Sequence, residues 1–235
     1  GFPAGGGPAG GATVEPVQAA ARGTFVSPLG GQWYPRQAAA LDNMLDTFLA
    51  EAETKPRDDV IALIVPHAGY EYSGATAAAA YKTIQGRHFS RVIVLGPSHR
   101  VSMPNTASVP DFQFLETPLG KVELDTVFIH YLKKMRPLFS TVASAHNGEH
   151  SVQIQVPFLQ KVLGDFKLVP IVVGQLDMET ARTMAYQLGS LMDNETLVVI
   201  STDFTHFGEG FRYVPFRADI PENLRALDMG AFDQI

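Results

Sequence analysis

The sequence predicts an α/β fold in which helices cover both faces of a mostly parallel central sheet, a three-layer sandwich. The runs DVIALIVP, RVIVLG, KLVPIVVG and TLVVIS are continuously apolar and rich in β-branched residues, which is typical of strands buried on both faces. Segments with helical spacing of apolar residues separate these runs. Alternating strands and helices build parallel sheets through crossover connections, and 235 residues suffice for one such domain.

The first half of the chain sets out this pattern. Residues 1–16 are almost uncharged Gly, Pro and Ala, which predicts a flexible lead-in to a single domain over 17–235. Apolar residues recur at helical spacing within 36–53. The run over 59–66 is expected to be a central strand covered on both faces. Further on, we expect a helix over 73–84, a strand over 91–96, and one or two antiparallel edge strands within 101–120.

The second half continues the alternation. Strands are expected over 167–174 and 196–201. Helices are expected over 124–135, 152–163, 178–192 and 222–232. Pro157 is expected to kink the helix over 152–163.

Composition excludes several classes of function. The formal net charge is -6 and no run of Lys or Arg occurs, so neither nucleic acid nor an anionic membrane is expected as a partner. No apolar stretch reaches the roughly 20 residues that cross a bilayer, and we expect a cytoplasmic protein. The 235 residues include no cysteine, which excludes thiolate metal sites and thiol catalysis by these residues.

Three of the seven histidines follow predicted strands: His67, His99 and His206. Side chains at the carboxyl ends of neighbouring parallel strands converge on one crevice, so these imidazoles predict a metal site. Pro and Gly residues punctuate the loops at His67 and His99, and Ser98 is available to orient the second loop. Taken singly, each of these histidines is better explained as an ordinary loop residue; it is the recurrence of the same position three times that predicts a site.

Two further pairs accompany these histidines. Asp203 lies three residues before His206, which would place both on one face of a helical turn; alternatively, Asp203 caps a helix and His206 packs against phenylalanines. Glu149 and His150 stand at the expected start of a helix, where they are either part of the site or a solvated cap. The other three histidines, His88, His130 and His146, are expected on the surface.

Imidazole nitrogen suits iron, zinc or copper, and a neighbouring carboxylate suits Fe(II) with open coordination positions. A histidine outside the ligand set would serve as acid or base. The sequence holds no G-x-S-x-G, P-loop, G-x-G-x-x-G or H-E-x-x-H motif, which disfavours serine hydrolases, nucleotide hydrolysis, dinucleotide redox chemistry and zincin proteolysis.

An ordered set of motifs resembles the Memo family, protein B of the AmmeMemoRadiSam system. The motifs are QWYP, PHAGYEYSGATAA, VLGPSHR, TPLG, EHSVQIQVPFL, VPIVVG and STDFTHFGEGFRY, and they extend from about residue 22 to the end. The resemblance implies a fold similar to the class III extradiol dioxygenases, with a non-haem iron pocket at the strand ends.

The resemblance also implies roles for individual residues. His67 and His99 match the family's metal ligands, and His206 resembles the pocket acid/base, with Asp203 beside it. His150 is expected to line the same cavity as a third catalytic residue. The family takes a further ligand, commonly a cysteine, from a later segment, which is expected to be missing here. The substrate pocket is expected to include Tyr70, Trp33, Ser98 and Glu149.

Three functions compete. The first is a metal-dependent oxidoreductase acting on a small molecule, with Fe(II) expected and copper or zinc as alternatives. The second is a binding module for a peptide, or for radical-SAM and AMMECR1-like proteins of the same system. The third and least favoured is metal-dependent hydrolysis by the same histidines with Asp203.

Overall fold

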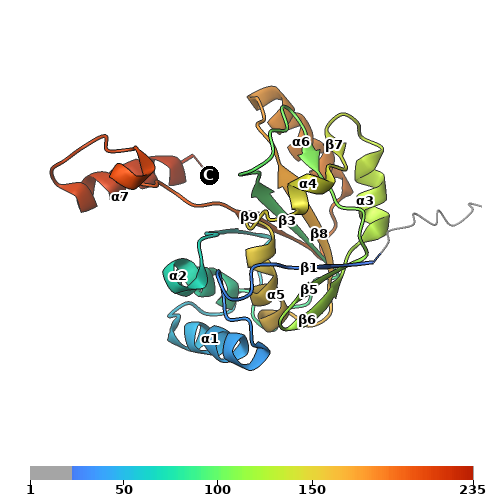
Figure 1. Cartoon of the computed structure of the whole chain (residues 1–235), viewed down its shortest axis with the longest axis horizontal. Coiled ribbons are helices and arrows are strands. Elements are labelled where there is room, and N and C mark those ends of the chain that lie inside the picture. Colours follow the sequence, from blue (N-terminus) through green and yellow to red (C-terminus); the bar gives the residue numbers. More distant parts are fainter. Residues whose placement is uncertain (1–22, 235) are drawn as a thin grey trace, which may run out of the picture.

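The computed structural model describes residues 23–234, so the predicted lead-in over 1–16 lies outside the described residues. A six-stranded sheet forms the centre of the molecule (Figure 1). Its first four strands are parallel, whereas the fifth is antiparallel to the fourth. In spatial order the strands are β2 (Ala62–Val65), β9 (Thr196–Ser201), β3 (Arg91–Pro97), β8 (Lys167–Val173), β4 (Ala107–Ser108) and β7 (Phe139–Ser140).

A second, three-stranded sheet lies beside the first. Here β1 (Thr24–Val26) pairs in parallel with β5 (Phe114–Thr117), which forms an antiparallel hairpin with β6 (Gly120–Glu123). The hairpin turns at Gly120, whose φ of 116° suits glycine. One or two antiparallel edge strands were expected within 101–120. β4 and β5 each make an antiparallel pair, but both lie inside their sheets, so their expected edge position is wrong.

Helices flank the large sheet and complete the predicted sandwich. On one side lie α1 (Ala38–Glu51), α2 (Tyr70–Lys82), α4 (Ala143–His146) and α5 (Val156–Val162); on the other lie α3 (Thr126–Lys133) and α6 (Met178–Leu191). Two short 3₁₀ helices cover Gln153–Gln155 and Glu209–Phe211. The mostly parallel α/β sandwich predicted from the sequence is therefore confirmed.

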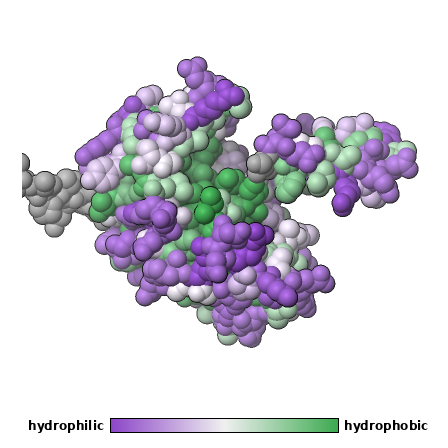
Figure 2. All heavy atoms as spheres, turned by 180° about the vertical axis from the view of Figure 1, so that it is seen from behind, coloured by the Kyte–Doolittle hydropathy of each residue, from purple (hydrophilic) through white to green (hydrophobic). Residues whose placement is uncertain are grey.

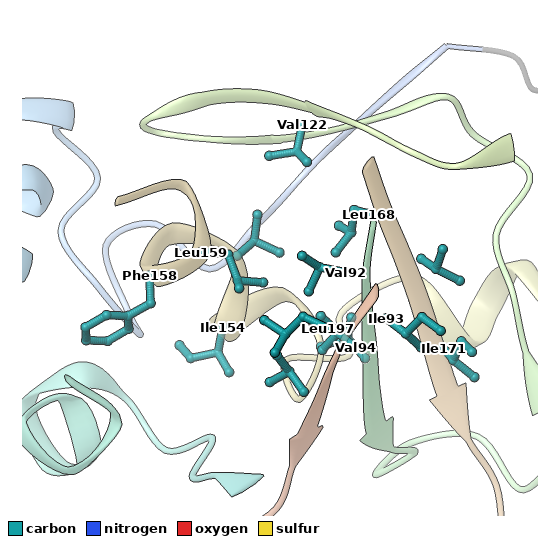
Figure 3. Packing of buried hydrophobic residues seen from close by; sticks show 14 of the residues in the cluster. Val92, Ile93, Val94, Val122, Ile154, Phe158, Leu159, Leu168, Ile171 and Leu197 are labelled. Atoms are coloured by element: carbon teal, nitrogen blue, oxygen red, sulfur yellow. The ribbon is translucent and has the colours of Figure 1, made fainter. Parts of the chain in front are cut away.

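The core follows from the apolar runs. β3 lies inside the sheet, and Val92, Ile93 and Val94 on its two faces are all inaccessible to solvent. Side chains of β8, β9 and α5 pack around them (Figure 3). On α1, Leu41, Leu45 and Leu49 follow the helical period and form its buried face.

Two expectations about individual elements are wrong. The run over 59–66 forms not a central strand but β2, at the edge of the sheet, and Ile61 just before it is 75% exposed. Strand order depends on which segments pair, and a run of apolar residues does not encode that choice. Pro157 does not kink a long helix; it lies in the first turn of α5, where its missing N–H costs nothing.

The C-terminal helix α7 (Ile220–Phe232) extends away from the sandwich (Figure 1). None of its residues is buried. Seen from behind, the projecting arm carries hydrophilic residues interspersed with apolar ones, and apolar residues also gather on the neighbouring face of the main body (Figure 2).

Candidate metal centre

The strand order brings the predicted histidines together. β9 lies between β2 and β3, and the three strands are parallel, so the loops that follow them meet at one end of the sheet. His67 follows β2 and His99 follows β3, and their ring centroids are 5.2 Å apart. The convergence predicted for His67 and His99 is thus present, whereas His206, the third histidine predicted there, is not among the rings of this cluster.

His150 joins this pair from a separate segment, the turn between α4 and the first 3₁₀ helix. Its ring centroid lies 5.3 Å from that of His67 and 4.5 Å from that of His99. Each of the three rings offers one nitrogen, and these nitrogens all lie within 4.8 Å of one another. Three imidazoles at this spacing could hold a metal ion.

His67 is held at both its backbone and its ring. Its N–H donates to Asp203 Oδ1 at 2.7 Å, and its Nδ1 lies 3.2 Å from Ser201 Oγ at the end of β9. Gln155 in turn donates to that hydroxyl at 2.8 Å and to the carbonyl of Pro66 at 2.9 Å. The His67 imidazole therefore has Nδ1 engaged by the sheet, while Nε2 lies 3.6 Å from Asp203 Oδ2.

Glu149 lies buried beneath the other two rings. Its Oε2 accepts from the His99 N–H at 2.7 Å, and its Oε1 lies 2.9 Å from His99 Nδ1 and 3.4 Å from His150 Nδ1. The N–H of Ser151 also donates to Oε1, at 3.0 Å. Burial favours a higher pKa for Glu149, but the hydrogen bonds from His99 and Ser151 outweigh it and lower the pKa below its usual value.

Two histidines of the cluster, His67 and His150, are held in their neutral form. The pKa of His150 is lowered to about 4, chiefly by burial; Glu149 opposes this decrease, and His99 and His67 add to it. Burial also lowers the pKa of His67, with Asp203 acting in the opposite direction. Because only a neutral imidazole offers a lone pair to a metal, these environments favour the ligating form at neutral pH.

Asp203 and His206 meet beside the cluster. Asp203 Oδ2 lies 3.1 Å from His206 Nε2 and 3.6 Å from His67 Nε2, so one carboxylate oxygen contacts two imidazoles. The expected helical turn is wrong, because residues 202–207 form no helix. The contact arises instead from the irregular loop after β9, and His206 packs edge-on against Phe211, with ring centroids 4.9 Å apart.

The residues expected in a substrate pocket differ in their positions. Trp33 stacks on His150, with centroids 4.1 Å apart and planes at 19°. Tyr70 is buried at the start of α2, where its hydroxyl donates to the carbonyl of Ile154 at 2.7 Å. Both line a recess of about 210 Å³ between α1 and α2. Ser98 donates to the carbonyl of Val101 and shapes the His99 loop.

His146 contradicts the expectation of a surface residue. Its side chain is buried, Nε2 lies 3.0 Å from Ser108 Oγ, and burial lowers its pKa to about 4. Sequence reasoning also missed Ser201 and Gln155, which support His67. Ser201 is the last residue of a buried strand, and His67 and His99 also follow buried strands. Its position at the end of a strand could therefore have indicated that Ser201 belongs to the site.

Among residues 23–234, no helix is both long enough and apolar enough to cross a bilayer.

Comparison with known proteins identifies the family. The model of the Memo-like protein family matches residues 27–235. The chain is 33% identical over 211 residues to a MEMO1 family protein of Pyrococcus horikoshii, covering 85% of this chain and 72% of the relative. It is 36% identical over 190 residues to a memo-1 homolog of Caenorhabditis elegans, covering 79% and 53%, respectively. Protein MEMO1 of Xenopus tropicalis is 32% identical over 216 residues, with coverage of 87% and 72%. The chain belongs to the Memo-like protein family.

Proposed function

We propose that this protein binds one transition-metal ion and supports redox chemistry on a small molecule at that ion. The observation that carries the proposal is the convergence of three imidazole nitrogens to within 4.8 Å of one another, from three separate segments. His67 and His99 are assigned as ligands, and His150 as a third donor. Three protein ligands are the usual number for a catalytic metal that keeps an open position.

The donor set fits iron best, with copper and zinc as alternatives. Imidazoles accept all three metals, but a neighbouring carboxylate adds the hard oxygen donor that suits Fe(II). Asp203 Oδ2, 3.6 Å from His67 Nε2, provides that oxygen. Bound iron or copper would supply one-electron chemistry, whereas zinc would supply only a Lewis acid.

Asp203 and His206 are assigned to proton transfer. His206 Nε2 shares a proton with Asp203 Oδ2 across 3.1 Å, and the His206 ring is half exposed beside the cluster. This imidazole can therefore exchange protons with solvent while its neighbour, Asp203, holds the His67 loop. Trp33 excludes water from one face of His150 by stacking on it.

A binding module is the second candidate. Phe204 and Phe211 are 45% and 61% exposed and flank His206, so a peptide or partner protein could dock beside the histidines. Radical-SAM and AMMECR1-like proteins remain the proposed partners in that case. Binding that persists without metal would favour the module over the redox centre.

The test is calorimetric titration of Fe(II), under anaerobic conditions, and of Zn²⁺ and Cu²⁺. Wild type is expected to bind one ion, and His67→Ala, His99→Ala and His150→Ala are each expected to lower affinity by about 10-fold or more. His88→Ala is the matched control, because His88 is an exposed histidine outside the cluster. The proposal fails if the three cluster variants bind like the control.

A further inference from the structure

Glu149 contacts two of the three histidines of the cluster through a single carboxylate. Oε1 lies 2.9 Å from Nδ1 of His99 and 3.4 Å from Nδ1 of His150. Oε2 accepts from the backbone N–H of His99 at 2.7 Å, and Oε1 accepts from that of Ser151 at 3.0 Å. The carboxylate thereby links the loop after β3 to the turn that carries His150.

An ionised carboxylate can only accept hydrogen bonds. A ring nitrogen that faces it at hydrogen-bond distance must therefore carry the proton, which leaves the lone pair on the other nitrogen. For His99 the nitrogen that hydrogen-bonds to Glu149 is Nδ1, at 2.9 Å. His150 Nδ1 lies 3.4 Å from the same oxygen in a charge contact rather than a hydrogen bond, and the negative charge favours the proton on that nitrogen as well. The nitrogen left to bind a metal is then Nε2 in each ring.

The charge of Glu149 has no ordinary counter-charge. Its side chain is only 2% exposed, and within residues 23–234 its ion-pair partners are His99 and His150, with no lysine or arginine among them. Desolvating a carboxylate without a cation is costly. A metal ion held on the far side of the two imidazoles would supply that positive charge through the rings.

We propose that Glu149 is the positioning residue of the metal centre, which orients His99 and His150 together so that Nε2 of each ring points to the ion. This inference rests on the proposed metal site and names the group that prepares it. A carboxylate–histidine–metal arrangement usually serves one ligand. Here one carboxylate serves two ligands from different segments, so removing it loosens both at once.

The turn that carries Glu149 is itself anchored. Gln153 donates from Nε2 to the carbonyl of Glu149 at 2.7 Å and to that of His146 at 3.0 Å. Ser151 Oγ donates to the carbonyl of Pro97 at 2.8 Å, which ties the turn to the end of β3. The carboxylate is thus held rigidly relative to both rings, as positioning requires.

The experiment begins with the metal-free wild-type protein. Long-range ¹H–¹⁵N NMR spectra of the histidine rings distinguish the Nδ1–H from the Nε2–H tautomer. We expect His99 and His150 to be Nδ1–H. A predominant Nε2–H tautomer at either ring would overturn the proposal, whatever the protein does with metals.

The second arm uses Glu149→Gln, which keeps the shape but loses the charge, with Glu123→Gln as the matched control. Glu123 is a half-exposed carboxylate that pairs with Lys167. Glu149→Gln is expected to raise the Nε2–H population at both rings and to weaken Zn²⁺ binding by about 10- to 100-fold. The control should change neither property.

The outcomes separate this inference from the proposed function. Wild-type affinity in Glu149→Gln, or weaker binding with both tautomers unchanged, would show that Glu149 does not position the ligands. If wild type binds no metal while its rings show the Nδ1–H tautomers that Glu149→Gln loses, the proposed function fails and the positioning role stands.

Discussion

The backbone N–H of His67 donates to Asp203 Oδ1 at 2.7 Å, although the two residues stand 136 positions apart. The bond joins the loop after β2 to the loop after β9, the strand beside it. The same carboxylate reaches His206 through its other oxygen. One side chain therefore sets the distance between the histidine cluster and the half-exposed imidazole of His206.

Removing that carboxylate should loosen the loop. Asp203→Ala is expected to lower the free energy of unfolding by about 1–3 kcal/mol, because a hydrogen bond to a charged acceptor is lost and the His67 N–H is left without its partner. Asp203→Asn, which can still accept at Oδ1, should lose less. Denaturant unfolding measures both. Asp165→Ala, at an exposed position, is the control, and a loss in Asp203→Ala no larger than in this control would refute the structural role.

Acidification should destabilise the protein through His146. Its pKa is about 4 in the folded state against an ordinary value of 6.5, chiefly because it is buried. As the pH falls, His146 is therefore protonated in the unfolded chain before it is protonated in the folded protein. The free energy of unfolding decreases between about pH 6.5 and about pH 4, and this group accounts for roughly 3 kcal/mol of the decrease. Above about pH 6.5, where His146 is neutral in both the folded and the unfolded chain, this loss of stability is absent.

His146→Gln isolates that effect, because glutamine does not titrate. Urea unfolding of the variant and of wild type at pH 7 and at pH 4.5 should show a smaller loss on acidification in the variant. Carboxylates titrate in both proteins and cancel in the comparison. Parallel losses would mean that His146 accepts its proton as readily in the folded state as in the unfolded one.

Gly96 permits the close approach of the His150 turn to β3. A Cβ at this position would lie 2.6 Å from Ser151 Oγ and 2.9 Å from a methyl carbon of Val152. Gly96→Ala is therefore expected to push the turn outward, separating His150 from His99 and weakening metal binding by about 10-fold or more. Calorimetry measures the affinity.

The matched control is Gly189→Ala within α6, where a Cβ meets nothing within 4 Å. Alanine there should stabilise the helix by about 0.5–1 kcal/mol and leave metal affinity unchanged. If Gly96→Ala also binds metal like wild type, the turn tolerates the added methyl and close packing does not set the donor spacing.

Trp33 should report on the metal centre by fluorescence. It is the only tryptophan in the chain and stacks on His150 at 4.1 Å. Binding of Cu²⁺ at the cluster is expected to quench its emission with the same affinity that calorimetry gives. His150→Ala should reduce the quenching. Quenching that is equal in wild type and in the triple His67/His99/His150 alanine variant would place the copper elsewhere.

The sequence located most of the elements, but not their neighbours. The apolar runs at β3, β8 and β9 were correctly predicted to be buried strands. A strand buried on both faces needs continuous apolar character, which is a local property of the sequence. β2 carries a similar run and lies at the edge. Its place depends on pairing with β9, in which each residue pairs with one 136 positions away, as Ala62 does with Val198, and no local pattern encodes such a pairing.

The site shows the same division. His67 and His99 could be recognised as a pair from the sequence, because each follows a buried strand and parallel strands end at the same edge of a sheet. Glu149 and His150 could be noticed as neighbours, but whether they were solvated or part of the site stayed open. His146 was misassigned to the surface, because burial of a short helix depends on what packs over it.

The sequence by itself determined the α/β class, the loops that carry the histidines and the family, since each depends on residue types at short spacing. The tertiary structure alone decided that His150 completes the cluster, that Glu149 lies beneath two rings, and that Asp203 joins His67 to His206. The physical reason is that the decisive contacts, of Asp203 with His67 and of Glu149 with His99, join segments far apart in the chain, and their distances are set by the close packing of the whole core.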